Sequence, residues 1–489
     1  MTFDNRLTAA ARLALRSAIT VGSVAPAPRP PALPSRQVAP HRRFVPTSRP
    51  SGGWRADLLG LHPGEPATCR RDLRQFLATW VHLTLMLAVV KVYRIEGRGL
   101  MLLAGLAWAA LPVHYLLAYR WKKPFFLAVS VAGLFGGFGP EAGLSVVGLA
   151  LGLIAVTRLP VRWGVRAGLV AAIGVGLGIA RGWAAGNGSP WAEVVWPVVG
   201  SMMMFRMIVY LYEIKHVDRP EPLVDTLSYF FLLPNYCFIH FPVVDYRTLN
   251  RSFCQAEVHA TQRVGLRMIF NGLIHLLAYR LVYHLLNIPP EQVHDGPTLA
   301  LSIVANYLLY LQVSGQFHLA CGMLHLFGYG LPTTHHHYLL ASGFTDYWRR
   351  VNIYWKDFMV RVVFHPLAFR WKRRPRWQAL GGATVAVFVT TWALHAYQSF
   401  WVRGTWGFSV PDATFWGILG VLVLVNVQLD ARDGDARLAR GSTRPALGAS
   451  LIRGVKVAAT FTTLATLWSL WSSPDLATWV GMFRRAFAG

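Results

Sequence analysis

The sequence predicts an all-α membrane protein: a polytopic bundle of about 10–12 transmembrane helices, some broken or re-entrant, with amphipathic helices at the interface. Of the 489 residues, 54% are hydrophobic and 19 are Trp, which favours the membrane–water interface. The apolar residues form long runs without Asp, Glu, Lys or Arg, such as 76–90, 100–119 and 379–402. As a helix, each run covers most of a hydrocarbon core of about 30 Å. The lipid bilayer is therefore an expected partner.

The chain divides into two regions of different composition. Residues 1–66 are rich in Arg and Pro and should form a disordered arm, because they cannot bury an apolar core. Residues 67–489 form the predicted multi-pass membrane domain. Its expected spans are 76–93, 99–119, 124–140, 142–157, 163–181, 191–213, a broken segment 223–244, 265–287, 298–330 as one long or two short elements, 379–402, 409–429 and 451–472. Residues 346–362 have the spacing of one amphipathic helix, with the pairs Asp346–Arg350 and Asp357–Arg361.

The basic residues indicate how the protein lies in its membrane. The formal net charge is +26, and it is spread over short loops between the apolar runs. A nucleic-acid-binding protein gathers such charge in one stripe or domain, so we expect no nucleic-acid partner. Positive loops are typical of the cytoplasmic face, which predicts a multi-pass protein of the cell (inner) membrane. The basic loop 370–376 should be cytoplasmic, and a reporter fusion at residue 374 that lies outside the cell would contradict this.

Two places within the predicted spans hold polar side chains that lipid should exclude, which makes them functional candidates. Arg206 and Glu213 lie on one helical face and either line a substrate path or clamp helices together. His395 follows an uncharged run from Ala379, where burial favours the neutral imidazole that a general base requires. Gln398, one turn on, could fix its tautomer. Alternatively, His395 is a structural histidine bonded to a backbone carbonyl.

A third group of polar residues raises the question of a metal. Six histidines lie between 318 and 365, including the run 335–337. Membrane di-iron oxidases supply imidazoles from HxxxH and HxxHH boxes, and neither spacing occurs here. The four Cys form no CxxC pair. We therefore expect no metal site and no bound cofactor, although a histidine-ligated oxidase stays as an alternative.

Three segments, which follow one another along the chain in the family's order, carry a resemblance to a known family. Phe344–Phe358, which contains Tyr-Trp-Arg-Arg-Val-Asn-Ile, resembles the signature of the membrane-bound O-acyltransferase (MBOAT) family in its bacterial polysaccharide-acetylating branch. Trp392–Trp401 resembles the later Trp-His-Gly element of that family. Phe205–Glu213, followed by Tyr229–Asn235 and Asp245–Arg247, is similar to the upstream region of the same branch. Together the segments span about 205–401.

The resemblance implies roles for individual residues. His395 matches the catalytic histidine, and Asn352 falls where the family has a second polar residue, Asn or His. Trp348, Arg349 and Trp392 belong to the matching segments, and with Gln398, Arg206 and Glu213 they are the expected substrate-binding residues. The sequence departs from the pattern of this branch at Val351, where the branch has Trp, at Asn352, where its bacterial members have His, and at Ala396, where it has Gly.

The implied reaction is O-acyl transfer from a thioester, either acyl-CoA or an acyl carrier protein, to a hydroxyl of a lipid, glycan or small molecule. In it, His395 would be the general base and Asn352 would orient the acceptor or stabilise the oxyanion. The alternative is a transporter or flippase, in which Arg206, Glu213 and the histidines line a polar pathway. A transporter should show two repeated halves with matching broken helices, and the sequence has none.

Overall fold

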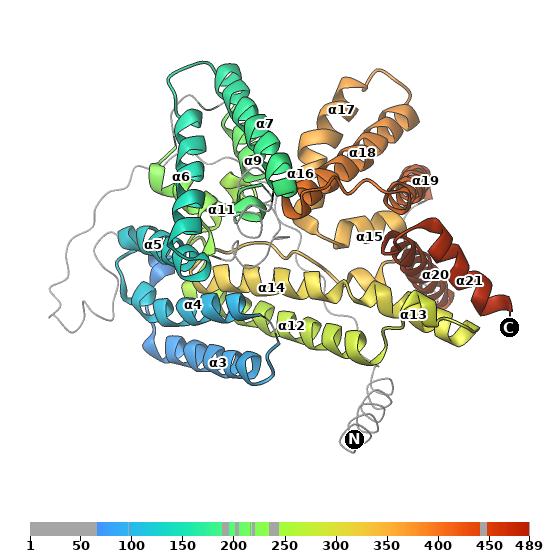
Figure 1. Cartoon of the computed structure of the whole chain (residues 1–489), viewed down its shortest axis with the longest axis horizontal. Coiled ribbons are helices and arrows are strands. Elements are labelled where there is room, and N and C mark those ends of the chain that lie inside the picture. Colours follow the sequence, from blue (N-terminus) through green and yellow to red (C-terminus); the bar gives the residue numbers. More distant parts are fainter. Residues whose placement is uncertain are drawn as a thin grey trace. The chain divides into compact units, whose positions relative to one another are not determined.

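The computed structural model describes residues 66–95, 97–187, 195–200, 205–215, 217, 221–233, 244–440 and 447–488. Over these residues the chain folds into helices joined by short loops, with one isolated antiparallel bridge between Phe253 and Tyr329 (Figure 1). The all-α class predicted from the apolar runs is thus confirmed. The predicted N-terminal arm lies outside the described residues, apart from Pro66.

Five long helices follow one another in the N-terminal part. They are α3 (Leu73–Val92), α4 (Arg98–Leu116), α5 (Tyr119–Phe138), α6 (Pro140–Thr157) and α7 (Trp163–Asn187), and each packs against the next up to the α6–α7 pair. Asp72 caps α3, because its side chain accepts hydrogen bonds from the backbone N–H groups of Arg74 and Gln75 at 3.0 and 3.2 Å. Gly139, at φ 82° and ψ 170°, separates α5 from α6 in a positive-φ conformation that favours glycine.

The middle of the chain contains shorter elements. These are α8 (Val195–Pro197), α9 (Phe205–Ile214), α10 (Leu223–Phe230) and α11 (Tyr246–Ser252). Helix α10 ends at Phe230, well inside the predicted segment 223–244, whose residues 234–243 are not described. The described part of this segment, residues 223–233, therefore contains the predicted helix break.

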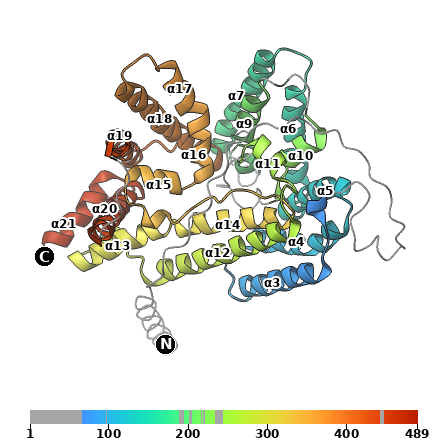
Figure 2. The ribbon, with the colours of Figure 1, turned by 180° about the vertical axis from the view of Figure 1, so that it is seen from behind.

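The tightest helix pair consists of α12 (Val258–Leu285) and α14 (Leu311–Leu326), which lie side by side in Figure 2. Four glycines face one another across the pair: Gly265 opposite Gly322, and Gly272 opposite Gly315. A β-carbon on any of the four would lie 2.7–2.9 Å from the carbonyl oxygen of its partner. Because small residues let helix backbones approach closely, these glycines define the contact.

The predicted segment 298–330 proves to be two elements. Helix α13 (Gly296–Leu308) ends before Leu309, and α14 starts after Tyr310. Asp295 begins α13 with a capping box, in which its carboxylate accepts from the backbone N–H of Thr298 at 2.8 Å while the Thr298 hydroxyl accepts from the backbone N–H of Asp295.

The prediction that residues 346–362 form a single amphipathic helix is wrong. The chain forms α15 (Phe344–Arg350), a break at Val351 and Asn352, α16 (Ile353–Met359), a π-helical turn (Val360–Phe364) and α17 (His365–Arg370). The break exists because the preceding loop bonds to the chain on both sides of it. The N–H of His336 donates to the carbonyl of Arg350 at 3.0 Å, and the N–H of Ile353 donates to the carbonyl of Thr334 at 2.8 Å.

The two ion pairs predicted for that helix have different outcomes. Arg350 Nε lies 2.7 Å from Asp346 Oδ1, as the i,i+4 spacing predicts. Asp357 instead pairs with Lys356, and Arg361 turns away to Glu213 and Asp245. Arg361 therefore pairs with two carboxylates that are distant in the sequence, and not with the predicted local partner Asp357.

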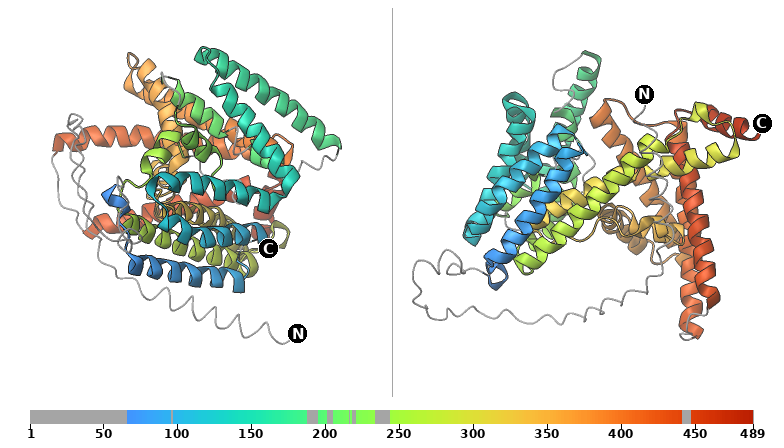
Figure 3. Two further views of the ribbon diagram at one scale, coloured as in Figure 1. Left: turned by 90° about the vertical axis from the view of Figure 1, so that its left-hand side faces the viewer. Right: turned by 90° about the horizontal axis from the view of Figure 1, so that it is seen from below.

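The C-terminal part contains α18 (Arg376–Arg403), α19 (Val410–Arg440), α20 (Leu447–Trp471) and α21 (Leu476–Ala488). Helix α19 packs against both α18 and α20, and Figure 3 shows α19 and α20 side by side. Aromatic side chains form much of this contact. Phe415 and Trp471 stack with ring centroids 4.8 Å apart, and Trp471 meets Trp468 edge-on at 5.0 Å.

Eight helical segments of the described chain are long and apolar enough to cross a membrane. They are Leu73–Val92, Gly99–Leu116, Pro140–Thr157, Trp163–Ala184, Val195–Ile214, Gly296–Leu326, Arg376–Arg403 and Val410–Ala431. The predicted spans at 124–140, 265–287 and 451–472 are helical as well, but their helices α5, α12 and α20 carry several basic residues. The protein is thus a multi-pass membrane protein with many outward-facing apolar side chains.

Candidate active site

A cavity of about 680 Å³ lies where α9, α14, α16, α18, α19 and α20 meet. Its walls are mostly aromatic and small polar side chains, with Asp412 and Arg403 as the charged residues among the described ones. The lining side chains include Phe205, Tyr310, Phe317, Asn352, Trp355, His395, Gln398, Arg403, Asp412, Trp468 and Trp471. The cavity therefore brings together residues from sequence positions 205 to 473.

His395 occupies this cavity from the middle of the long helix α18. Three indole rings surround its imidazole: Trp416 at 4.9 Å, Trp355 at 6.1 Å and Trp471 at 6.2 Å between ring centroids. Trp355 is itself held, since its Nε1–H donates to the hydroxyl of Thr391 at 3.4 Å. The imidazole is thus fixed by bulky side chains from α16, α19 and α20 while it faces an open volume.

Asn352 reaches the same cavity from the break between α15 and α16. Its backbone is left-handed, with φ 39° and ψ 62°, a conformation that Asn tolerates better than most residues. The side-chain oxygen accepts a hydrogen bond from the N–H of Trp355 at 3.4 Å and so caps α16. This leaves the amide NH₂ of Asn352 as a donor on the cavity wall.

Of the residues predicted to bind substrate, Gln398 lines the cavity and the others do not. Trp392 is one turn before His395, and its Nε1–H donates to the Asp412 carboxylate. Trp348 packs against Phe388, with ring centroids 4.9 Å apart. Arg349 is exposed at the surface of α15.

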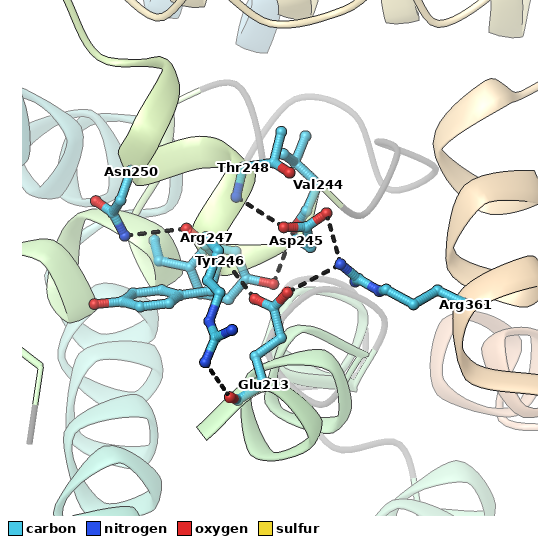
Figure 4. Close-up of polar contacts among 9 residues, drawn as sticks. Glu213, Val244, Asp245, Tyr246, Arg247, Thr248, Asn250 and Arg361 are labelled. Atoms are coloured by element: carbon cyan, nitrogen blue, oxygen red, sulfur yellow. Dashed lines mark hydrogen bonds and ion pairs between the residues drawn. The ribbon is translucent and has the colours of Figure 1, made fainter. Parts of the chain in front are cut away.

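Arg206 and Glu213 are both buried but belong to a different polar cluster. Arg206 donates to the backbone carbonyl of Tyr229 and lies over the Tyr229 ring, 5.0 Å from its centroid. Glu213 lies 3.1 Å from Arg361 and accepts from the backbone N–H of Arg247 at 3.0 Å (Figure 4). The two residues therefore tie α9 to neighbouring segments, and the structure does not place them on the cavity wall.

Arg361 also lies 3.2 Å from Asp245, so that one guanidinium bridges two carboxylates (Figure 4). Asp245 in turn caps α11, because it accepts from the N–H of Thr248 at 2.7 Å. Through this cluster the π-helical turn that follows α16 is fixed to α9 and α11. This cluster therefore helps to fix the position of α16, and hence of Asn352, relative to the rest of the bundle.

The buried histidines adjoin the cavity from the side of α14. The Tyr310 hydroxyl, on the cavity wall, lies 3.0 Å from His335 Nε2. Burial lowers the pKa of His335 well below its usual value, and the neighbouring His318 and His275 lower it further. No group of three or more His, Cys, Asp or Glu residues in the described part of the chain has the arrangement of a metal site.

Among the cavity residues that the sequence did not single out are Asp412 and Trp471. The signal for Asp412 is a carboxylate at the start of the apolar run 410–431, where a charge is costly. Trp471 could not have been found from spacing, because it reaches the site through packing of α20 on α19.

No protein-family model matches the chain, and no curated protein is similar to it.

Proposed function

We propose that the protein is a membrane-embedded O-acyltransferase in which His395 is the general base. One observation carries the proposal: His395 and Asn352, which come from distant elements, line the same cavity with Gln398. A base and an amide donor facing one cavity are what acyl transfer to a hydroxyl requires. The resemblance to the MBOAT signature at both residues supports the same chemistry.

In this reaction His395 removes the proton of the acceptor hydroxyl as its oxygen attacks the thioester carbonyl carbon. The negative charge that develops on the carbonyl oxygen accepts a hydrogen bond from the amide of Asn352. The carbon–sulfur bond then breaks, and the sulfur leaves as a thiol with the proton that His395 carried. The proton balance closes within the site, so no other acid or base is needed.

The alternative function, a transporter, uses Arg206 and Glu213 in a polar pathway. Both side chains instead make the contacts described above with backbone groups and with Arg361. The geometry therefore supports the acyltransferase better. The acyl donor, acyl-CoA or an acyl carrier protein, and the hydroxyl acceptor are part of the proposal.

The test compares the purified wild type with His395→Ala in detergent, using radiolabelled acetyl-CoA and a long-chain acyl-CoA with a membrane extract as acceptor. We expect label transfer by the wild type and a loss of about 10²–10⁴-fold without the base. The matched control is His294→Ala, at an exposed loop histidine, which should transfer label at the wild-type rate. Equal transfer by His395→Ala and the wild type would remove His395 from the mechanism.

Asn352→Asp tests the second residue without disturbing the backbone. Asp tolerates the left-handed conformation and can still accept from the N–H of Trp355, but it lacks the amide donor. We expect normal folding and a decrease in kcat of about 10²–10³-fold, the range for loss of one oxyanion donor. Unchanged kcat would show that Asn352 acts only as a helix cap.

A further inference from the structure

The cavity contains a carboxylate that acyl transfer does not use. Asp412 lies in the first turn of α19, and the residue is 9% exposed. Its Oδ1 accepts from Trp471 Nε1–H at 2.7 Å, and its Oδ2 accepts from Trp392 Nε1–H. Two indole donors from α20 and α18 thus hold the carboxylate in place in the cavity that His395 also lines.

These donors leave the negative charge of Asp412 without a counter-charge. An indole N–H is neutral, and Asp412 forms no salt bridge within the described residues. The amino end of α19 compensates only in part, because a helix terminus carries about half a unit charge. A buried, unpaired carboxylate is costly to maintain, so this one is suited to a cationic partner that enters the cavity.

The other walls of the cavity suit the same kind of partner. Aromatic rings line it on several sides, from Phe205, Tyr310, Phe317, Trp355, Trp468 and Trp471. The faces of such rings attract organic cations, and aromatic cages are a common way to bind ammonium groups. Arg403, the basic residue on the wall, is exposed at the end of α18, where water screens its charge.

We propose that this cavity accepts a substrate bearing an ammonium group, with Asp412 as its counter-ion and the aromatic rings around it. The proposal rests on the proposed function, since it names the substrate class for the cavity of His395. The ammonium can come from either substrate: an amino alcohol as acceptor, or an aminoacyl thioester as donor. In both cases the cation would lie beside the imidazole that activates the hydroxyl.

The test measures binding without turnover, using two pairs of probes that match in shape and differ in charge. The acceptor pair is choline and its neutral analogue 3,3-dimethylbutan-1-ol. The donor pair is the alanyl and isobutyryl thioesters of N-acetylcysteamine. Binding to the purified full-length protein in detergent is followed by tryptophan fluorescence, since Trp355, Trp468 and Trp471 lie on the cavity wall.

We expect the wild type to bind the charged member of at least one pair about tenfold or more tightly than the neutral member. The pair that shows this preference identifies the source of the ammonium. Asp412→Asn should lose the preference and keep its affinity for the neutral probe, whereas Asp430→Asn, at an exposed acid of the same helix, should retain it. Equal affinities within both pairs for the wild type would overturn the proposal.

Two further outcomes separate this proposal from others. If Asp412 served only to join α18, α19 and α20, Asp412→Asn would weaken both members of a pair equally, and the proposal would fail. If the variant does not fold, Trp392→Phe takes its place: it removes one indole donor and keeps the charge, so the preference must persist. His395→Ala should also keep the preference, so that loss of acyl transfer and loss of ammonium binding are distinguishable.

Discussion

Substitution of Gly272 by Ala tests whether the close contact between α12 and α14 supports the fold. A β-carbon at this position would lie 2.8 Å from the carbonyl oxygen of Gly315 and 3.1 Å from the backbone N of Leu319. Both atoms belong to the backbone of the facing helix, so no side chain can turn aside to make room. The two helices would have to separate by a few tenths of an ångström along their contact.

Two opposing terms decide the sign of the effect. Replacing Gly by Ala within a helix gains about 1 kcal/mol, because Gly has more freedom to lose on folding. Forcing extra volume into a packed contact costs about 1–3 kcal/mol, and here the facing groups are rigid backbone, which places the cost at the upper end. We therefore expect Gly272→Ala to destabilise the protein by about 1–2 kcal/mol.

The assay is thermal unfolding of the purified protein in detergent, with Gly148→Ala as the matched control. Gly148 lies inside α6, and a β-carbon there would meet no atom within 4 Å. We expect the control to keep or raise the Tm and Gly272→Ala to lower it by a few degrees. A higher Tm for Gly272→Ala, as for the control, would refute the contact as described.

Two other predictions concern charge. Arg361→Ala should cost about 1–3 kcal/mol of stability in a chemical unfolding assay, because it leaves Glu213 and Asp245 without their shared cation; Arg361 is partly exposed, which keeps the cost moderate. Adding Glu213→Gln to Arg361→Ala should recover part of this loss, and no recovery would contradict the charge argument. Burial keeps the pKa of His335 well below its ordinary value of 6.5, so the folded state resists protonation more than the unfolded state does. As the pH falls below 6.5, this histidine should therefore lower the free energy of unfolding with a slope that approaches about 1.4 kcal/mol per pH unit. His335→Gln should make the dependence of Tm on pH shallower, whereas substitution of the exposed His337 should leave it unchanged.

The all-α fold could be predicted from the sequence because a lipid bilayer permits few backbone structures. A segment that crosses lipid must satisfy its backbone internally, so each apolar run had to be a helix. The predicted span 379–402 accordingly lies within α18, which begins at Arg376 and ends at Arg403. Hydropathy also located His395, since an imidazole in an uncharged run is conspicuous.

The helix break at Val351 and Asn352 could not be predicted from the sequence pattern. Helical spacing continues across it, and the residues on both sides are ordinary helix formers. What ends α15 is the pair of backbone hydrogen bonds with Thr334 and His336, from a loop that local pattern does not connect to this site. Asp412 was missed for a similar reason, because its indole partners come from two other helices.

The same break explains how two polar residues can face one cavity with little freedom to move. His395 is fixed on a helix of 28 residues and surrounded by three indole rings. Asn352 has no such helix beneath it, yet backbone hydrogen bonds hold the residues on either side of it, and its own side chain bonds to the N–H of Trp355. Trp355 also contacts the imidazole of His395, so its indole links the helix that Asn352 caps to the residue proposed as the general base. Effective acyl transfer needs both groups within about 3 Å of the reacting atoms, and this shared indole is a physical means of keeping that geometry.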